Sequence, residues 1–325
     1  MIRRRRPLIA GAMALFCGPR FVAAQTPAKV WRIGYLSQGA GENNYTRAFV
    51  EGMRALGYIE GRNISIEYRF SGEQWDRLPI LANELVQLKV DIIVTEGSRP
   101  VTAVKGATST IPVVMAAASD PIGSGFVTSL ARPGGNLTGM SMTSSDLASK
   151  DLELLREFAP KATRVALLTN PTSNGKRFTE QVQAAARSTG MTLAVQAVEK
   201  AAELPGALAA LLRERPQLMV VQYGTFSLTH RREIIEFAAL NRLPAIYGNR
   251  ALAESGGLLS YGPDLTDMYR RAAYFVDRIV KGAKPADMPV EQPTKYELFI
   301  NQKTASALGL TIPQSLLLRA NDVIQ

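Results

Sequence analysis

Hydrophobic positions in this chain fall into two alternating kinds of segment. Short apolar runs bounded by turn residues, such as residues 90–95 and 112–118, are typical of buried strands in a parallel sheet. Longer segments, such as residues 76–88, carry apolar residues at helical spacing and predict helices with one buried face. The alternation is a βα repeat, so the first half should form a mainly parallel, doubly wound sheet.

Residues 111–141 contain the last predicted strands of the first half. An apolar run ends there at Ser119, and Asp120 with Pro121 predicts a helix start, because Asp is a favoured N-cap and Pro suits the first helical position. A strand that ends where a helix begins gathers free backbone N–H groups at the carboxyl edge of the sheet. Open α/β sheets bind their ligands at that edge, so this stretch is a candidate binding region.

The same alternation restarts after residue 145, which predicts a second α/β lobe. Its expected strands are residues 163–169, 191–198, 217–222, 244–247 and 258–261, with helices between them. Residues 264–281 then form a strongly amphipathic helix, and the tail adds an extended piece at 296–300 and a short helix. The sequence therefore predicts two α/β lobes in tandem.

The first 24 residues differ from the rest. A basic start (residues 3–6), a short apolar core (8–16) and small residues at 22–24 predict an export signal that is cleaved after Ala24. A membrane anchor is the alternative, but about nine apolar residues cannot span a bilayer that needs roughly 20. We expect the mature chain to be exported and soluble.

Net charge argues against a nucleic-acid partner once the signal is considered. The full chain carries a formal charge of +10, and removal of residues 1–24 takes away five arginines and no acidic residue, leaving +5. The remaining charges mix in sign along the predicted helices and form no long basic stripe.

The mature chain has few residues suited to catalysis. Its one histidine is His230, and it has no cysteine, because Cys17 lies in the predicted signal. This composition excludes zinc sites built from His and Cys and a cysteine nucleophile. Gly39 and Gly41 imitate the start of a dinucleotide-binding motif, but Asn44 occupies the third glycine position, so a tight turn is the favoured interpretation. We expect no enzyme activity, no metal and no cofactor.

Short motifs spread over most of residues 31–324 resemble those of the exported substrate-binding proteins of ABC transporters, in the group that includes tryptophan- and tyrosine-binding members. The matching segments are 34–36 (GYL), 52–57 (GMRALG), 63–68 (NISIEY), 111–114 (IPVV), 119–121 (SDP), 131–139 (ARPGGNLTG), 243–247 (LPAIY), 256–262 (GGLLSYG), 269–273 (YRRAA), 280–287 (VKGAKPAD), 289–296 (PVEQPTKY) and 307–313 (ALGLTIP). Together they are specific, although each segment alone is weak.

This resemblance implies the type I periplasmic-binding-protein fold, with two Rossmann-like lobes and one small ligand held in the cleft between them. The helix that begins at Asp264 is implied to return to the first lobe. The expected division is a signal peptide (1–24), an N-terminal lobe (27–142 plus about 262–284) and a C-terminal lobe (143–261 plus about 285–325).

In such a fold the ligand contacts come from strand-to-helix turns at the cleft. The candidate ligand-binding residues of the two lobes are Ser37, Gln38, Gly97, Ser98, Ser119 and Asp120, and Asn170, Ser173, Tyr223, Thr225, Asn249 and Tyr261. Hydroxyls and helix N-terminal amides suit a ligand carboxylate, Asp120 suits an ammonium group, and the tyrosines suit a flat or apolar body. Helix capping by Asp120 and core packing of the tyrosines are the alternatives.

The chain departs from the family at residues 96–99, where relatives usually have small neutral residues. Arg99 either clamps a ligand carboxylate with its planar guanidinium group or faces solvent. The resemblance implies a periplasmic, monomeric protein that captures an amino-acid-like or carboxylate-bearing solute by lobe closure and delivers it to a membrane permease. An exported sensory module and an α/β enzyme using the same cleft are the alternative functions.

Overall fold

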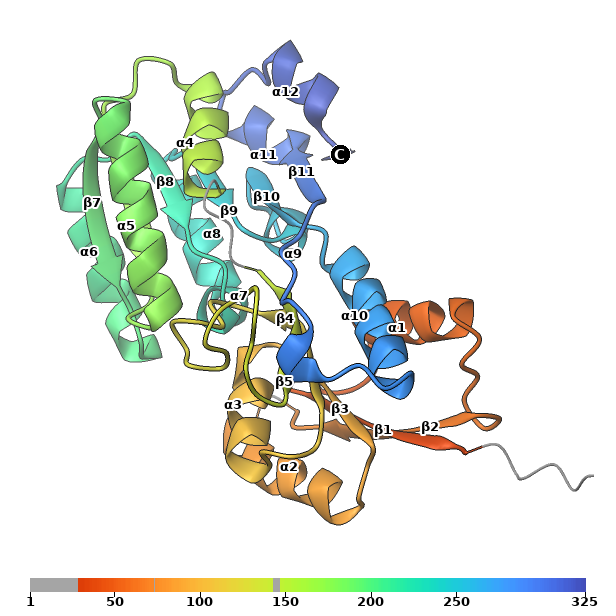
Figure 1. Ribbon diagram of the computed structural model, residues 1–325. Coiled ribbons are helices and arrows are strands. Elements are labelled where there is room, and N and C mark those ends of the chain that lie inside the picture. The colour runs from red at the N-terminus through yellow and green to blue at the C-terminus, as the bar shows by residue number, and fades with distance from the viewer. Residues whose placement is uncertain (1–28, 73, 143–146) are drawn as a thin grey trace, which may run out of the picture.

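The computed structural model describes residues 29–72, 74–142 and 147–325. Figure 1 shows two α/β lobes, each built around its own sheet, with the carboxyl terminus on the second. The predicted signal peptide lies outside the described residues.

The first sheet has five parallel strands in the order β2-β1-β3-β4-β5. Its strands are β1 (Trp31–Ser37), β2 (Ile64–Phe70), β3 (Ile92–Glu96), β4 (Val113–Ala118) and β5 (Leu137–Ser141). The intervening helices are α1 (Asn44–Ala55), the 3-10 turn η1 (Trp75–Arg77), α2 (Leu78–Gln87) and α3 (Ser98–Ala107). The doubly wound sheet predicted for the first half is confirmed.

Helices cover both faces of this sheet, because successive side chains on a strand point to opposite sides. Ile92 and Val94 of β3 pack into the cluster that includes α1, whereas Ile93 packs into the cluster of α2 and α3. Since both faces are buried, the strands are nearly continuous apolar runs.

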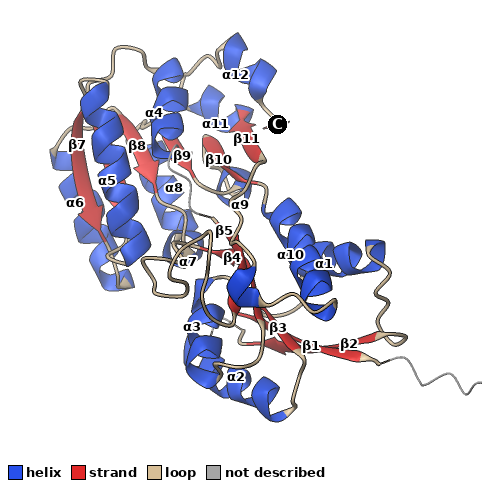
Figure 2. Cartoon of the chain, viewed as in Figure 1, coloured by secondary structure: helices blue, strands red, loops and turns tan. Residues whose placement is uncertain are grey.

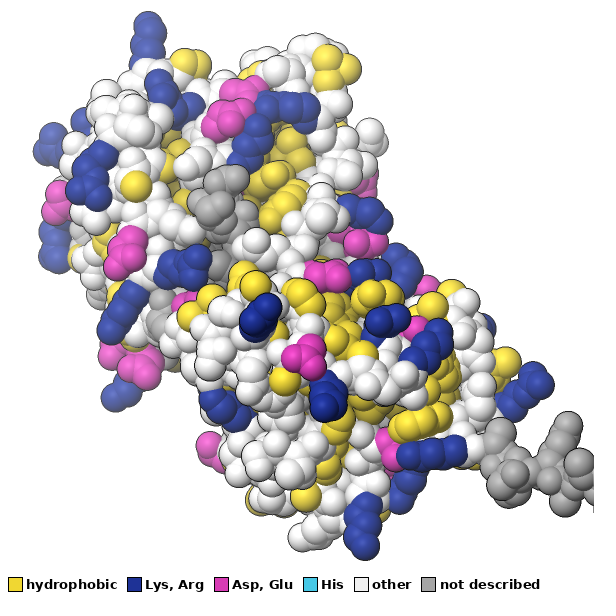
Figure 3. All heavy atoms as spheres, in the orientation of Figure 1, with side chains coloured by type: hydrophobic (Ala, Val, Ile, Leu, Met, Phe, Trp, Pro, Cys, Tyr) yellow, Lys and Arg dark blue, Asp and Glu magenta, His cyan; other side chains and the backbone are white. Residues whose placement is uncertain are grey.

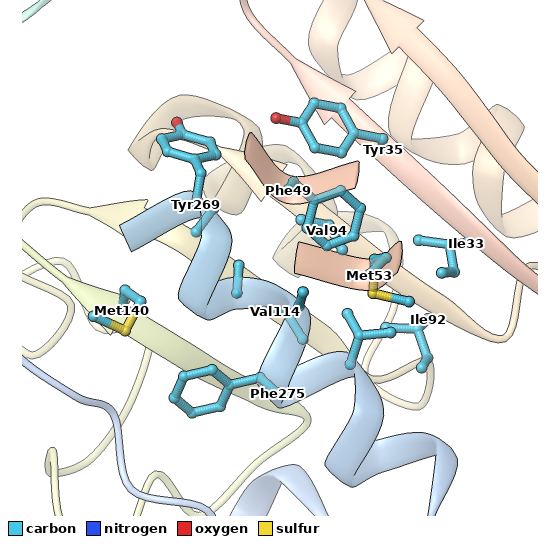
Figure 4. Close-up of a cluster of buried hydrophobic side chains, with 14 of the residues drawn as sticks. Ile33, Tyr35, Phe49, Met53, Ile92, Val94, Val114, Met140, Tyr269 and Phe275 are labelled. Atoms are coloured by element: carbon cyan, nitrogen blue, oxygen red, sulfur yellow. The ribbon is translucent and has the colours of Figure 1, made fainter. Parts of the chain in front are cut away.

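A helix from much later in the chain completes the first lobe. Helix α10 (Leu265–Val280) packs against α1 and β4, and the side chains of both helices lie among those of β1, β3 and β4 in Figure 4. The hydroxyl of Tyr58 donates to Asp277 Oδ1 at 2.9 Å, which adds a polar link between the end of α1 and α10.

The second sheet has seven strands in the order β12-β11-β10-β9-β8-β6-β7. All neighbouring pairs are parallel except β10 with β11, which are antiparallel. Its strands are β6 (Arg164–Thr169), β7 (Thr192–Ala197), β8 (Leu218–Val221), β9 (Ala245–Tyr247), β10 (Leu259–Pro263), β11 (Tyr296–Asn301) and β12 (Asp322–Ile324).

The helices of the second lobe also lie on both sides of their sheet (Figure 2). They are α4 (Leu147–Phe158), α5 (Ser173–Ser188), the 3-10 turn η2 (Ala201–Glu203), α6 (Leu204–Arg213), α7 (Thr225–Thr229), α8 (Arg231–Leu240), α9 (Arg250–Glu254), α11 (Gln302–Ala307) and α12 (Gln314–Arg319). The tandem of two α/β lobes is therefore confirmed.

The helix predicted to begin at Asp120 is wrong, because residues 121–125 form consecutive turns. Asp120 has a left-handed backbone with φ of 45°, and its side chain accepts from the Gly123 amide at 3.1 Å. Gly125 and Gly134 also have positive φ values, which a continuing helix does not allow. The Asp120 side chain does accept from a backbone amide as an N-cap would, but the segment that it stabilises is a turn.

Three connections join the lobes: between β5 and α4, between β10 and α10, and between Glu291 and β11. Before the third crossing, η3 (Pro285–Asp287) and the residues after it still pack on the first sheet, where Thr138 Oγ1 donates to the Met288 carbonyl at 2.8 Å. The lobe boundaries expected from the sequence remain a prediction.

Candidate functional site

A cavity of about 1260 Å³ lies between the two lobes. Its walls come mainly from the turns that follow β1, β3 and β4 in the first lobe and β6 and β8 in the second. Parallel strands bring their carboxyl ends to one edge, and each lobe turns that edge towards the other. The cavity therefore occupies the position at which two-lobed α/β proteins bind their ligands.

The most deeply placed charged group in the cavity wall is Glu96, the last residue of β3, whose exposed fraction is 8%. Asn43 Nδ2 donates to its Oε1 at 3.0 Å, and the Tyr35 hydroxyl donates to its Oε2 at 3.3 Å. Burial raises the pKa of the Glu96 carboxyl, while hydrogen bonds from Asn43, Ser37 and Tyr35 oppose that rise.

The turn before α1 builds this arrangement. Asn43 is the N-cap of α1, and its Oδ1 accepts from the amides of Tyr45 and Thr46 at 2.8 and 3.0 Å. Its amide nitrogen is thereby left pointing at Glu96. One side chain both starts the helix and supports the buried carboxyl.

Aromatic rings form the wall beside Glu96. Tyr45 of α1 stacks on Tyr269 of α10 with ring centroids 5.0 Å apart, and Tyr223 of the second lobe also lines the cavity. Burial raises the pKa of all three hydroxyls, and the negative charge of Glu96 raises each further.

Arg99 lies on another part of the wall, in the first turn of α3. Its guanidinium carbon stands 3.7 Å from the ring centroid of Trp75. Among the ion pairs of the described residues, none includes Arg99. The cation is thus oriented by stacking and retains donors for a ligand anion.

Half of the residues predicted to bind the ligand line the cavity: Gln38, Gly97, Ser98, Ser119, Asn170 and Tyr223. Ser98 Oγ accepts from the Ser119 amide at 2.8 Å and so ties the turns after β3 and β4 together. The structure thus brings these six residues to one cavity, and their contact with a ligand remains a prediction.

Four other predicted residues lie outside the cavity lining. Ser37 is fully buried and accepts from the Gly39 amide at 2.9 Å, and Asn249 caps α9 by accepting from the Ala251 amide at 2.9 Å. Asp120 supports its turn, and Tyr261 stacks on Tyr296 with centroids 5.6 Å apart. Each has a structural partner of its own.

The last two predicted residues, Ser173 and Thr225, begin α5 and α7, and their side chains lie outside the described part of the molecule. The prediction also omitted Glu96, Tyr45 and Tyr269 from the site. An acidic residue that ends a buried strand was a usable signal for Glu96. The two tyrosines occupy positions that the helical pattern assigns equally well to a core.

An ion pair joins the lobes next to the cavity. Arg177 Nη1 of α5 lies 3.3 Å from Asp120 Oδ1, and the Asp120 side chain is only 4% exposed. Because this pair exists only while the lobes are close together, it stabilises the closed arrangement. Its contribution is small, about 0.5–1 kcal/mol, since the arginine is largely in solvent.

We expect Arg177→Ala to open the ligand-free protein, seen as a larger radius of gyration in X-ray scattering. The apparent Kd of a bound solute should rise by about 2–5-fold, which corresponds to the loss of the ion pair's contribution of about 0.5–1 kcal/mol to the closed form. Arg69→Ala is the matched control, because it breaks a 2.7 Å pair with Glu84 inside the first lobe. Equal scattering profiles for wild type and Arg177→Ala would show that the ion pair between Arg177 and Asp120 does not hold the lobes together.

Within the described ranges, no group of three His, Cys, Asp or Glu side chains is placed to hold a metal ion. No helix in that part of the chain combines the length and apolar character needed to cross a bilayer. On the face in Figure 3, basic and acidic side chains are interspersed over both lobes.

Two doubly wound lobes, joined by three connections and enclosing one cavity, define a protein of the type I periplasmic-binding-protein fold. A family model described as ABC transporter substrate binding protein matches residues 36–324, and the chain belongs to this family. It is therefore a substrate-binding protein of an ABC transporter, a role that implies a small-molecule ligand and a membrane transporter as partners.

Individual relatives agree with this assignment. A tyrosine-binding protein of Clostridioides difficile is 25% identical over 265 residues, which span 81% of this chain and 76% of that protein. A crystal structure from Streptococcus pneumoniae, described as an ABC domain in complex with L-Trp, is 27% identical, with a TM-score of 0.83 over 91% of this chain and all of the other.

A ligand-free, open substrate-binding protein from Clostridium difficile, with adhesive properties, is 24% identical and has a TM-score of 0.74 over the same shares. At 24% identity, this structural similarity supports the fold of the chain but not a shared function.

Proposed function

We propose that this chain is exported through residues 1–24, works as a monomer in the periplasm, and captures an amino-acid-like or carboxylate-bearing solute between its lobes. The observation that carries the proposal is the 1260 Å³ cavity, whose walls come from both lobes. A ligand that touches both lobes binds the closed form more tightly than the open one and so shifts the population towards closure. The closed form then docks on the permease.

Two features support the solute class. Arg99 is held by Trp75 in the cavity wall, and a planar guanidinium suits bidentate contact with a carboxylate. The relatives include a tyrosine-binding protein and a structure in complex with L-Trp, so an amino acid is the first class to examine. The chemistry ends at binding, and the solute leaves unchanged.

The test is calorimetry and X-ray scattering on residues 25–325 with the 20 common L-amino acids, small carboxylates and purines. We expect at least one solute to bind saturably, to reduce the radius of gyration and to be recovered intact by mass spectrometry. The scattering mass should equal that of one chain. A panel without binding, or a bound compound that is converted to product, would refute the proposal.

A further inference from the structure

The Glu96 carboxyl is buried without a cationic partner. Its hydrogen-bond donors are Asn43 and Tyr35, both neutral groups. None of the ion pairs among the described residues includes Glu96. Buried carboxylates in proteins are normally paired with a cation, because an isolated buried charge is strongly unfavourable.

Two basic side chains of the cavity wall are engaged with other partners. Arg99 stacks on Trp75, and the Lys105 ammonium donates to the Gly125 carbonyl. Neither group neutralises the carboxyl. A solute cation that enters the cavity would give this carboxyl the charged partner that it lacks among the described residues.

The rings beside Glu96 suit a cation as well. Tyr45, Tyr223 and Tyr269 line the same cavity, and the charge of Glu96 acts on all three hydroxyls. Aromatic faces attract an ammonium group, and the attraction grows when water is excluded. Since Tyr223 comes from the second lobe and the other two from the first, lobe closure surrounds the cation on several sides.

We propose that Glu96, together with Tyr45, Tyr223 and Tyr269, binds a protonated amine of the solute, so that the cavity selects amine-bearing ligands over their amine-free analogues. This inference rests on the proposed function and specifies which part of the solute is recognised. Arg99 and Glu96 then give the cavity a positive and a negative part, complementary to a zwitterion.

The experiment uses matched solute pairs that differ only in the amine: L-tyrosine with 3-(4-hydroxyphenyl)propionate, L-tryptophan with 3-indolepropionate, and L-leucine with 4-methylpentanoate. Kd values are measured by calorimetry for residues 25–325 and for the isosteric variant Glu96→Gln. We expect the amine-bearing member to bind more tightly to the wild type. Glu96→Gln should weaken it by at least about 30-fold, the usual effect of removing one partner of a buried charge pair.

Two controls separate recognition from folding. The amine-free member should bind wild type and Glu96→Gln within about threefold, because it never contacts the carboxylate; a misfolded variant would lose both members. Glu67→Gln removes a partly exposed carboxylate that pairs with Arg32 on β1, outside the cavity lining, and should change neither affinity.

The outcomes distinguish the inference from the proposed function. If amine-free acids bind as tightly as their amines, or if Glu96→Gln leaves amine affinity unchanged, the amine assignment is overturned while solute binding stands. If no pair and no other solute in the wider panel binds, the proposed function fails, and the inference fails with it.

Discussion

Replacing Gly52 by alanine should lower the free energy of unfolding by about 2 kcal/mol, although alanine is the better helix former. A Cβ at this position would lie 2.7 Å from the Arg270 carbonyl oxygen and 2.9 Å from the Ala273 Cβ. Both are too close, and the first is a backbone atom that cannot rotate away. Helix α10 would have to move off α1, which loosens the buried cluster in Figure 4.

The measurement is thermal unfolding followed by circular dichroism. With an unfolding entropy of about 2.1 cal/mol/K per residue, a loss of about 2 kcal/mol in a chain of this length corresponds to a Tm lowered by roughly 3 °C. Gly206→Ala is the matched control, because Gly206 lies in α6 with no atom within 4 Å of an added Cβ. It should leave Tm unchanged or raise it slightly; if both variants behave alike, the close contact between α1 and α10 is not what limits position 52.

The second large effect concerns Asp151, a carboxyl buried in α4. Its exposed fraction is 3%, and its Oδ1 atom has no hydrogen-bond partner. Burial raises the pKa of this carboxyl well above its ordinary value. The folded state therefore holds a proton that the unfolded chain releases, so stability is greatest below the unfolded pKa of about 4 and falls as pH rises through the folded pKa.

We expect Asp151→Asn to remove the fall in stability with rising pH that Asp151 causes. At pH 8 the variant should be more stable than wild type by on the order of 2 kcal/mol, and the difference should shrink as pH falls towards 4, where the unfolded chain begins to take up the proton that the folded state holds. Urea unfolding at several pH values measures it. Glu236→Gln, at an exposed position of α8, is the control and should run parallel to wild type. A constant gap between Asp151→Asn and wild type would contradict the prediction.

Periodicity was sufficient to predict most of the strands, although not the edge strand β12. Both faces of the central strands are buried, so runs such as β3 and β4 stand out as apolar segments between turns. The same rules failed after Asp120, because a good N-cap also suits a turn, and glycines with positive φ decide between the two. A capping residue alone does not determine whether a helix or a turn comes after it.

The candidate site was predictable only in part, for a related reason. Gln38 and Ser98 could be predicted as cavity residues, because the turns after parallel strands meet at one edge of the sheet. Tyr45 and Tyr269, the two tyrosines missed beside Glu96, come from α1 and α10, which the chain brings together only through packing between distant elements. A pattern within one segment carries no information about such partners.

The late position of α10 also determines the order in which the molecule is completed. Tyr58 and its hydrogen-bond partner Asp277 are 219 positions apart, so the part of the first sheet that α10 covers stays exposed until α10 has been synthesised. The amino-terminal lobe is thus begun first, but it is completed only after most strands of the second sheet have been made. An interrupted translation product would expose apolar surface that the full-length protein hides.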